Sequence, residues 1–137
     1  MGLILDSSII IAAERRRETA NQLLRHIRFV AGDQEVAIST IGLTELVHAI
    51  YRAPSIPMRL SHETFVHDLL AYIDVLPYAK STAWLAGRID GEQRSAGVTI
   101  PSMDLLIGAT ALEIGYAVVT ANVRHFRLIP GLNVIAL

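Results

Sequence analysis

The sequence predicts an α/β fold in which helices cover a short, mostly parallel five-stranded sheet. Short apolar runs alternate with longer stretches of helical periodicity, and parallel neighbouring strands need crossover connections of this kind. The chain is 52% hydrophobic and only 18% charged, which suggests a buried sheet and some apolar surface for a partner. Its 137 residues are near the commonest domain size, so we expect residues 1–137 to form a single domain.

Each expected element rests on a local pattern. The strands are short apolar runs at Leu3–Leu5, Val36–Ile38, Ile73–Leu76, Ala117–Thr120 and Val134–Ala136. The helices show helical apolar spacing over Ser8–Arg17, Thr19–Val30, Ile41–Arg52, Ser61–Tyr72, Lys80–Ala96 and Met103–Ile114. Serines are expected to cap three of these helices, namely Ser7 or Ser8, Ser61 and Ser102. We expect Pro54 and Pro57 to break the chain, and Gly115 to stop the last helix.

Composition excludes several classes of function. The formal net charge of −1 provides no overall basic field of the kind that many nucleic-acid-binding proteins carry. Without cysteine, neither disulfides nor thiolate metal sites can form. No apolar stretch is long enough to cross a bilayer, and the N-terminal segment lacks the features of a signal peptide. We therefore expect a soluble, cytoplasmic protein that does not engage a membrane.

Polar residues follow two of the expected strands directly. Asp6 comes after the first strand, and Thr120 and Asn122 lie at the end of the fourth. Ligands of parallel sheets bind at the carboxyl ends of the strands, so these residues share the edge where a site is expected. Glu45 and Asp104 each lie beside strongly apolar helical sequence.

An ionised carboxylate next to apolar sequence needs a partner, because burying it alone costs several kcal/mol. No basic residue is adjacent to Asp6, Glu45 and Asp104 together. A hard divalent cation would satisfy all three, and oxygen ligands without thiolates favour Mg²⁺ or Mn²⁺ over Zn²⁺. Each acid alone also has a simpler interpretation: Asp6 as a helix cap, and the other two as first-turn acids favoured by the helix dipole.

Other catalytic patterns are missing. The segment HETFVH is one residue too long for an HExxH zinc motif, and His26, His48 and His125 have no metal-binding spacing. We therefore expect these histidines at surface or helix positions. Neither a glycine-rich phosphate loop nor a GxSxG hydrolase elbow is present. Asn122 alone is most simply a turn residue after a strand.

Four segments together resemble the PIN-domain ribonucleases, and in particular the VapC toxins of type II toxin–antitoxin modules. They are LILDSS, ISTIGLTEL, IPSMDLLIGATALEIGYAVVTANVRHF and IPGLNVI, and the resemblance spans Leu3 to Ile135. DLLIGATAL with TANVRHF downstream is its most specific part. The resemblance implies a PIN-like three-layer α/β/α sandwich and a Mg²⁺- or Mn²⁺-dependent endoribonuclease that hydrolyses RNA phosphodiester bonds.

The resemblance also implies roles for individual residues. Asp6, Glu45 and Asp104 match the acids that hold the metal. Asn122 matches a fourth catalytic position that is often Asp, so this chain lacks one charge there, and a role in holding water or facing the substrate is expected. Polar residues that match supporting positions around the acids are Ser8, Ser39 and Thr120.

The implied partners are an RNA substrate, a second copy of the chain, and a VapB-type antitoxin. The C-terminal segment of the antitoxin is expected to lie in an apolar groove of this chain, and the complex with the antitoxin is expected to be a higher heteromer. Arg15, Arg16 and Arg124 belong to two basic runs that are either solvated helix faces or contacts to flanking RNA phosphates. Two alternatives stay open. One is a phosphoryl-transfer hydrolase with Asp6 as nucleophile. Such enzymes usually have a second acid two residues later, where this chain has Ser8, and this counts against the alternative. The other is a non-catalytic PIN-like regulator that binds RNA or protein.

Overall fold

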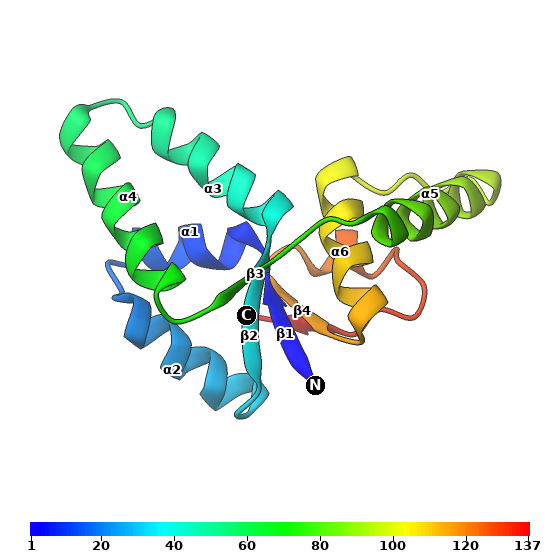
Figure 1. Ribbon diagram of the computed structural model, residues 1–137, viewed down its shortest axis with the longest axis horizontal. Helices are drawn as coiled ribbons and strands as arrows, with labels where there is room; N and C mark the ends of the chain where they lie inside the picture. Colours follow the sequence, from blue (N-terminus) through cyan, green and yellow to red (C-terminus); the bar gives the residue numbers. More distant parts are fainter.

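Five strands form one sheet at the centre of the molecule (Figure 1). The computed structural model describes residues 1–137. The strands are β1 (Gly2–Leu5), β2 (Glu35–Ser39), β3 (Asp74–Leu76), β4 (Ala117–Thr120) and β5 (Val134–Ala136). Their order in the sheet is β3-β2-β1-β4-β5, and every neighbouring pair is parallel. The predicted α/β fold is confirmed, and the sheet is parallel throughout rather than mostly so.

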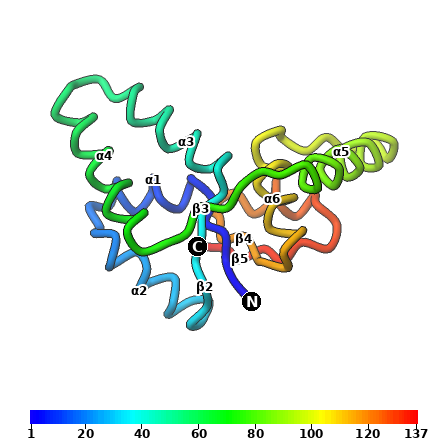
Figure 2. The backbone as a smooth tube through the Cα atoms, in the orientation of Figure 1, coloured from blue at the N-terminus to red at the C-terminus, as the bar shows by residue number.

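Seven helices connect the strands and cover both faces of the sheet. They are α1 (Ser7–Arg15), α2 (Ala20–Ala31), α3 (Thr40–Tyr51), α4 (Ile56–Leu70), α5 (Lys80–Ser95), α6 (Ser102–Ile114) and α7 (Val123–Phe126). Helices α1 to α4 lie on one side of the sheet, and α5 and α6 on the other (Figures 1 and 2). None of them combines the length and apolar character that crossing a membrane requires.

The three-layer sandwich follows from the alternation of side chains along the buried strands. Leu3 and Leu5 of β1 enter the core beneath α1 to α4, whereas Ile4 between them enters the core beneath α5 and α6. Val119 and Val118 of β4 divide in the same way. Successive strand side chains point to opposite faces, so a continuous apolar run supplies both cores.

The three predicted serine caps are wrong. Helix α1 begins at Ser7, so neither Ser7 nor Ser8 is its cap. Helix α4 begins at Ile56, because Ser55 caps it and Pro57 lies in its first turn, where a missing N–H costs no hydrogen bond. Pro57 thus lies in the first turn of a helix, where a break in the chain was expected.

Ser61 lies inside α4, and Ser102 is the first residue of α6 rather than its cap. The predicted stop at Gly115 is confirmed: its φ of 73° lies in the left-handed region that glycine tolerates. Helix α7 was not predicted, because four residues are too few to show a helical period.

Candidate active site

The candidate site lies at the carboxyl edge of the sheet, where β2, β1 and β4 end side by side. Helices α1 and α3 start at this edge because they follow β1 and β2 directly. Helix α6 also starts here, because it runs back across the sheet before β4 begins. The strand order reverses between β1 and β4, which is the position where open parallel sheets form ligand crevices.

Asp6 is only 2% exposed, and its carboxylate is held by two hydroxyl groups. Ser8 Oγ donates to Asp6 Oδ2 at 2.6 Å, and Thr120 Oγ1 donates to the same oxygen at 2.8 Å. Both hydroxyls also accept backbone N–H groups, from Ala121 at 3.2 Å and from Asn122 at 2.8 Å. The network ties the end of β1 to the end of β4.

The interpretation of Asp6 as a helix cap fails in one respect. Asp6 occupies the N-cap position of α1, but its side chain makes no capping hydrogen bond. Its hydrogen bonds go instead to Ser8 and to Thr120, which is 114 residues away in the chain. The carboxylate is therefore part of the sheet edge rather than of the helix end.

Glu45 lies in the second turn of α3 and accepts a hydrogen bond from Ser7. The distance from Ser7 Oγ to Glu45 Oε1 is 3.0 Å. Ser39 is buried and caps α3, accepting the Gly42 N–H at 2.9 Å, and it makes no hydrogen bond to a carboxylate. Ser39 thus fixes the start of the helix that carries Glu45, while Ser7 contacts the carboxylate itself.

Asp104 lies in the first turn of α6, and its carboxylate contacts an imidazole. His125 Nδ1 is 2.8 Å from Asp104 Oδ2. The Asp104 side chain is 13% exposed and that of His125 is 36% exposed. His125 lies on a helix, as expected, and α7 brings it against the first turn of α6.

The three carboxylates act on one another electrostatically. Burial raises the pKa of Glu45, and the nearby charges of Asp6 and Asp104 raise it further, against the hydrogen bond from Ser7. Burial likewise raises the pKa of Asp104, and Asp6 adds to this, while His125 opposes it. Neutral Asp or Glu is favoured where like charges meet in a poorly hydrated place.

The residues present suit a hard cation by their chemistry. All three acids offer oxygen donors, and none of them pairs with a lysine or arginine. No three acidic or histidine side chains converge closely enough to ligate one ion as they stand. This is the arrangement expected of like charges that repel each other and take up hydroxyl and imidazole partners instead. Histidines His62 and His67 pair with Glu14 and Glu63.

Asn122 and the arginines differ in how close they lie to this edge. Asn122 is exposed at the start of α7, and its backbone rather than its side chain enters the network. Arg124 is exposed on α7, beside His125. Arg15 and Arg16 lie at the far end of α1 from Asp6, and Arg16 pairs with Glu18 at 2.8 Å. Of the predicted phosphate contacts, Arg124 is the one next to the site.

Comparison with known proteins decides the family. The PIN domain family model matches residues 3–132. Ribonuclease VapC1 of Rickettsia felis is 33% identical over 135 residues, which cover 98% of this chain and 96% of that protein. The chain belongs to the VapC family of PIN domain proteins. The resemblance stated from the sequence is therefore confirmed.

Solved structures show that this PIN domain has the fold of VapC proteins in complexes. VapBC2 from Rickettsia felis, bound to a promoter DNA fragment, superposes with a TM-score of 0.86 at 21% identity, covering 100% of this chain and 99% of that one. VapBC-5 from Mycobacterium tuberculosis, of the VapBC family of toxin-antitoxin systems, gives 0.77 at 21% identity and 100% coverage of both chains.

Two residues at the edge of this PIN domain escaped sequence reasoning. Ser7 was considered only as a helix cap, and His125 only for a surface or helix position. Ser7 lies next to Asp6 in the chain, and His125 is one helical turn beyond Asn122, so both were adjacent to predicted site residues. Proximity to those residues is the signal that could have found them.

Proposed function

We propose that this chain is a Mg²⁺- or Mn²⁺-dependent endoribonuclease and the toxin of a type II toxin–antitoxin module. The observation that carries the proposal is the gathering of Asp6, Glu45 and Asp104 at one sheet edge without any lysine or arginine partner. The ribonuclease name of the Rickettsia felis relative supports the reaction class. Its natural site of action is then the cytoplasm, where cellular RNA is found.

The donor set defines what each residue would do. Asp6, Glu45 and Asp104 would hold the ion, which when bound supplies a Lewis acid for hydrolysis of a phosphodiester and offsets the charge of the acids. Ser8 and Thr120 hold the Asp6 carboxylate in place by donating two hydrogen bonds to Oδ2. Glu45 accepts the hydrogen bond of Ser7 at Oε1, which leaves Oε2 to orient a water or to accept its proton.

Asn122 and Arg124 are the residues best suited to meet the RNA. Asn122 is exposed at the site edge and carries no charge to repel a phosphate. Arg124 adds a positive charge two residues further along α7. Arg15 and Arg16 would contact only RNA that extends along α1.

A VapB-type antitoxin is the proposed protein partner. An open groove of about 990 Å³ runs between α1, α3 and α4, with Ile11, Ala49 and Met58 among its apolar lining residues. Exposed apolar surface of this kind commonly marks a partner site. The VapBC complexes among the structural relatives support this partner.

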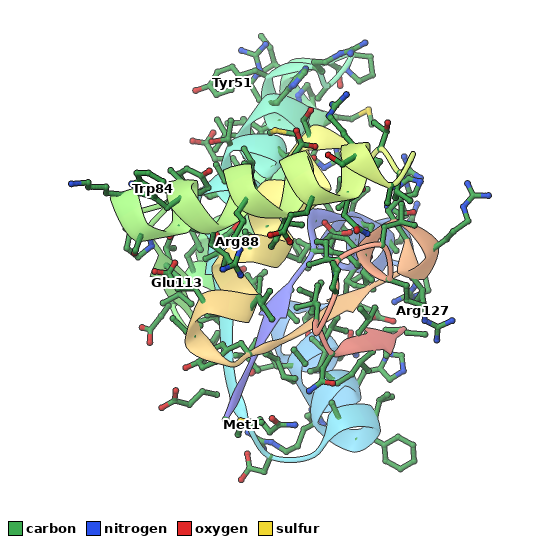
Figure 3. The ribbon with its side chains drawn as sticks, turned by 90° about the vertical axis from the view of Figure 1, so that its right-hand side faces the viewer. Met1, Tyr51, Trp84, Arg88, Glu113 and Arg127 are labelled. Atoms are coloured by element: carbon green, nitrogen blue, oxygen red, sulfur yellow. The ribbon has the colours of Figure 1, made fainter.

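A homodimer is proposed as the unit that the antitoxin binds, which makes the complex a higher heteromer. Trp84 on α5 is 74% exposed and lies on the outer side of the helix together with Arg88 (Figure 3). A large exposed aromatic side chain is typical of the centre of an interface. Trp84→Glu should convert the dimer to a monomer in light scattering; an unchanged mass would contradict this interface.

RNA cleavage by the purified chain tests the enzymatic proposal. Wild-type protein should cleave RNA with Mn²⁺ and stop when EDTA is added, and Asp104→Asn should reduce the rate by roughly 100-fold or more. Equal activity of wild type and variant would overturn the assigned site. Binding of RNA without cleavage and without Mn²⁺ binding would instead favour a non-catalytic regulator. Asn122 supports this alternative because it stands at a position that is often Asp.

A further inference from the structure

One short segment contacts two of the three acids. Residues 120–125 run from the last residue of β4 through a short turn into α7. At its start, Thr120 donates a hydrogen bond to Asp6, and near its end His125 contacts Asp104. One acid directly follows β1 and the other lies on α6, so this segment joins parts of the site that are otherwise distant in the chain.

We propose that His125 is a positioning residue for Asp104: its Nδ1–H holds Oδ2 of that carboxylate and leaves Oδ1 for the cation. This rests on the proposed function, since it presumes that Asp104 is a metal ligand. An ionised carboxylate only accepts hydrogen bonds, so the proton of the pair belongs to Nδ1. Partners of this kind fix the rotamer of a ligand and commonly cost a site 10- to 100-fold in metal affinity when removed, as an order of magnitude.

The imidazole contact is not needed to hold α7 in place. Phe126, the next residue, is fully buried and anchors the helix in the core beneath α5 and α6. Gln93 on α5 donates to the Leu128 carbonyl at 2.7 Å, just after α7. The backbone N–H of His125 is bonded to the Asn122 carbonyl at 3.1 Å. With the backbone held in these ways, the side chain of His125 is free for the site.

Two features separate this pair from the surface pair of His67 and Glu63. The Asp104 side chain is 13% exposed and belongs to one of the three acids of the edge, whereas the Glu63 side chain on α4 is 40% exposed. His125 Nδ1 is 2.8 Å from its carboxylate, while His67 Nε2 is 3.8 Å from Glu63. His67 therefore offers a matched control on the same protein.

Isothermal titration calorimetry of the metal-free protein with Mn²⁺ tests the proposal. We expect His125→Ala to weaken Mn²⁺ binding about tenfold or more, with an unchanged melting temperature of the metal-free protein. His125→Asn should restore binding to within about threefold of wild type, because its side-chain N–H can occupy the place of Nδ1–H. His67→Ala should bind like wild type. Excess Mn²⁺ should recover kcat in His125→Ala.

The outcomes distinguish a failure of the role of His125 from a failure of the proposed function. Binding that is lost in Asp104→Asn but unchanged in His125→Ala overturns the role of His125 and leaves the proposed function intact. Binding weakened equally in His125→Ala and His125→Asn overturns the hydrogen bond as the cause. No Mn²⁺ binding by wild type, together with no RNA cleavage, contradicts the proposed function and the role of His125 with it.

Discussion

Asp6 and Asp104 lie at the same edge of the sheet but are held in different ways. Asp6 is 2% exposed and receives two hydroxyl hydrogen bonds, one of them from the neighbouring strand. Asp104 is on the first turn of a helix, is more exposed, and has one imidazole partner. The acid at the strand end is thus part of the core, whereas the acid on the helix keeps contact with solvent. Asp6 therefore serves both the fold and the site, whereas Asp104 serves the site alone.

The largest expected effect separates stability from activity. Asp6→Ala and Asp104→Ala should each lower RNA cleavage by roughly 100-fold or more. Only Asp6→Ala should also lower the free energy of unfolding, by about 1–3 kcal/mol, because it leaves the buried hydroxyl of Thr120 and the partly buried hydroxyl of Ser8 without their acceptor. Asp104→Ala should change it by less than about 0.5 kcal/mol, since His125 can turn to water. Urea denaturation measures the unfolding free energy of both variants, and equal losses would contradict a structural role that belongs to Asp6 alone.

Removing one hydroxyl from the Asp6 network should have an intermediate effect. Thr120→Val keeps the shape of the side chain but removes a donor to Asp6 and an acceptor of the Asn122 N–H. We expect a loss of about 1–3 kcal/mol in unfolding free energy and about tenfold in cleavage. Thr110→Val is the control, because its hydroxyl bonds only the Leu106 carbonyl within α6. Similar losses in the control would argue against a special role of the network.

The contact to Glu45 should matter less, because that acid is only partly buried. Ser7→Ala removes the 3.0 Å hydrogen bond to Oε1 and, with it, the effect that lowers the pKa of Glu45. Cleavage should fall by up to about tenfold, and the pH at which activity sets in should move upward. Ser95→Ala, which removes a hydroxyl from an exposed helix end, serves as the reference. A pH profile identical to wild type would contradict the prediction.

The smallest effect is a gain of stability in metal-free buffer. The folded state raises the pKa of Glu45, mainly by burial, so it binds a proton more tightly than the unfolded chain does. The stability that protonated Glu45 contributes is fully present below the ordinary glutamate pKa and is lost as the pH rises through the raised pKa. Glu45→Gln cannot ionise, so with EDTA it should melt higher than wild type at pH 7 and equally near pH 4. Solvent screening keeps the difference below about 1 kcal/mol.

Much of the fold and part of the candidate site could be predicted because the relevant patterns are local. The apolar runs of β1 and β4, the acid after β1 and the acid in the first turn of α6 were all found from neighbouring residues. Helix starts were less accurate, because a serine such as Ser61 or Ser102 can lie inside a helix as well as cap it, and its neighbours in the sequence do not decide which.

The sequence by itself determined the parallel α/β fold, the family, and the three acids that follow or adjoin its buried elements. Tertiary structure alone decided which side chain holds each acid. Thr120 reaches Asp6 because β4 pairs with β1, and His125 reaches Asp104 because α7 packs against α6. Periodicity describes a residue's own element, whereas these contacts join residues 114 and 21 positions apart, whose proximity depends on strand order and packing.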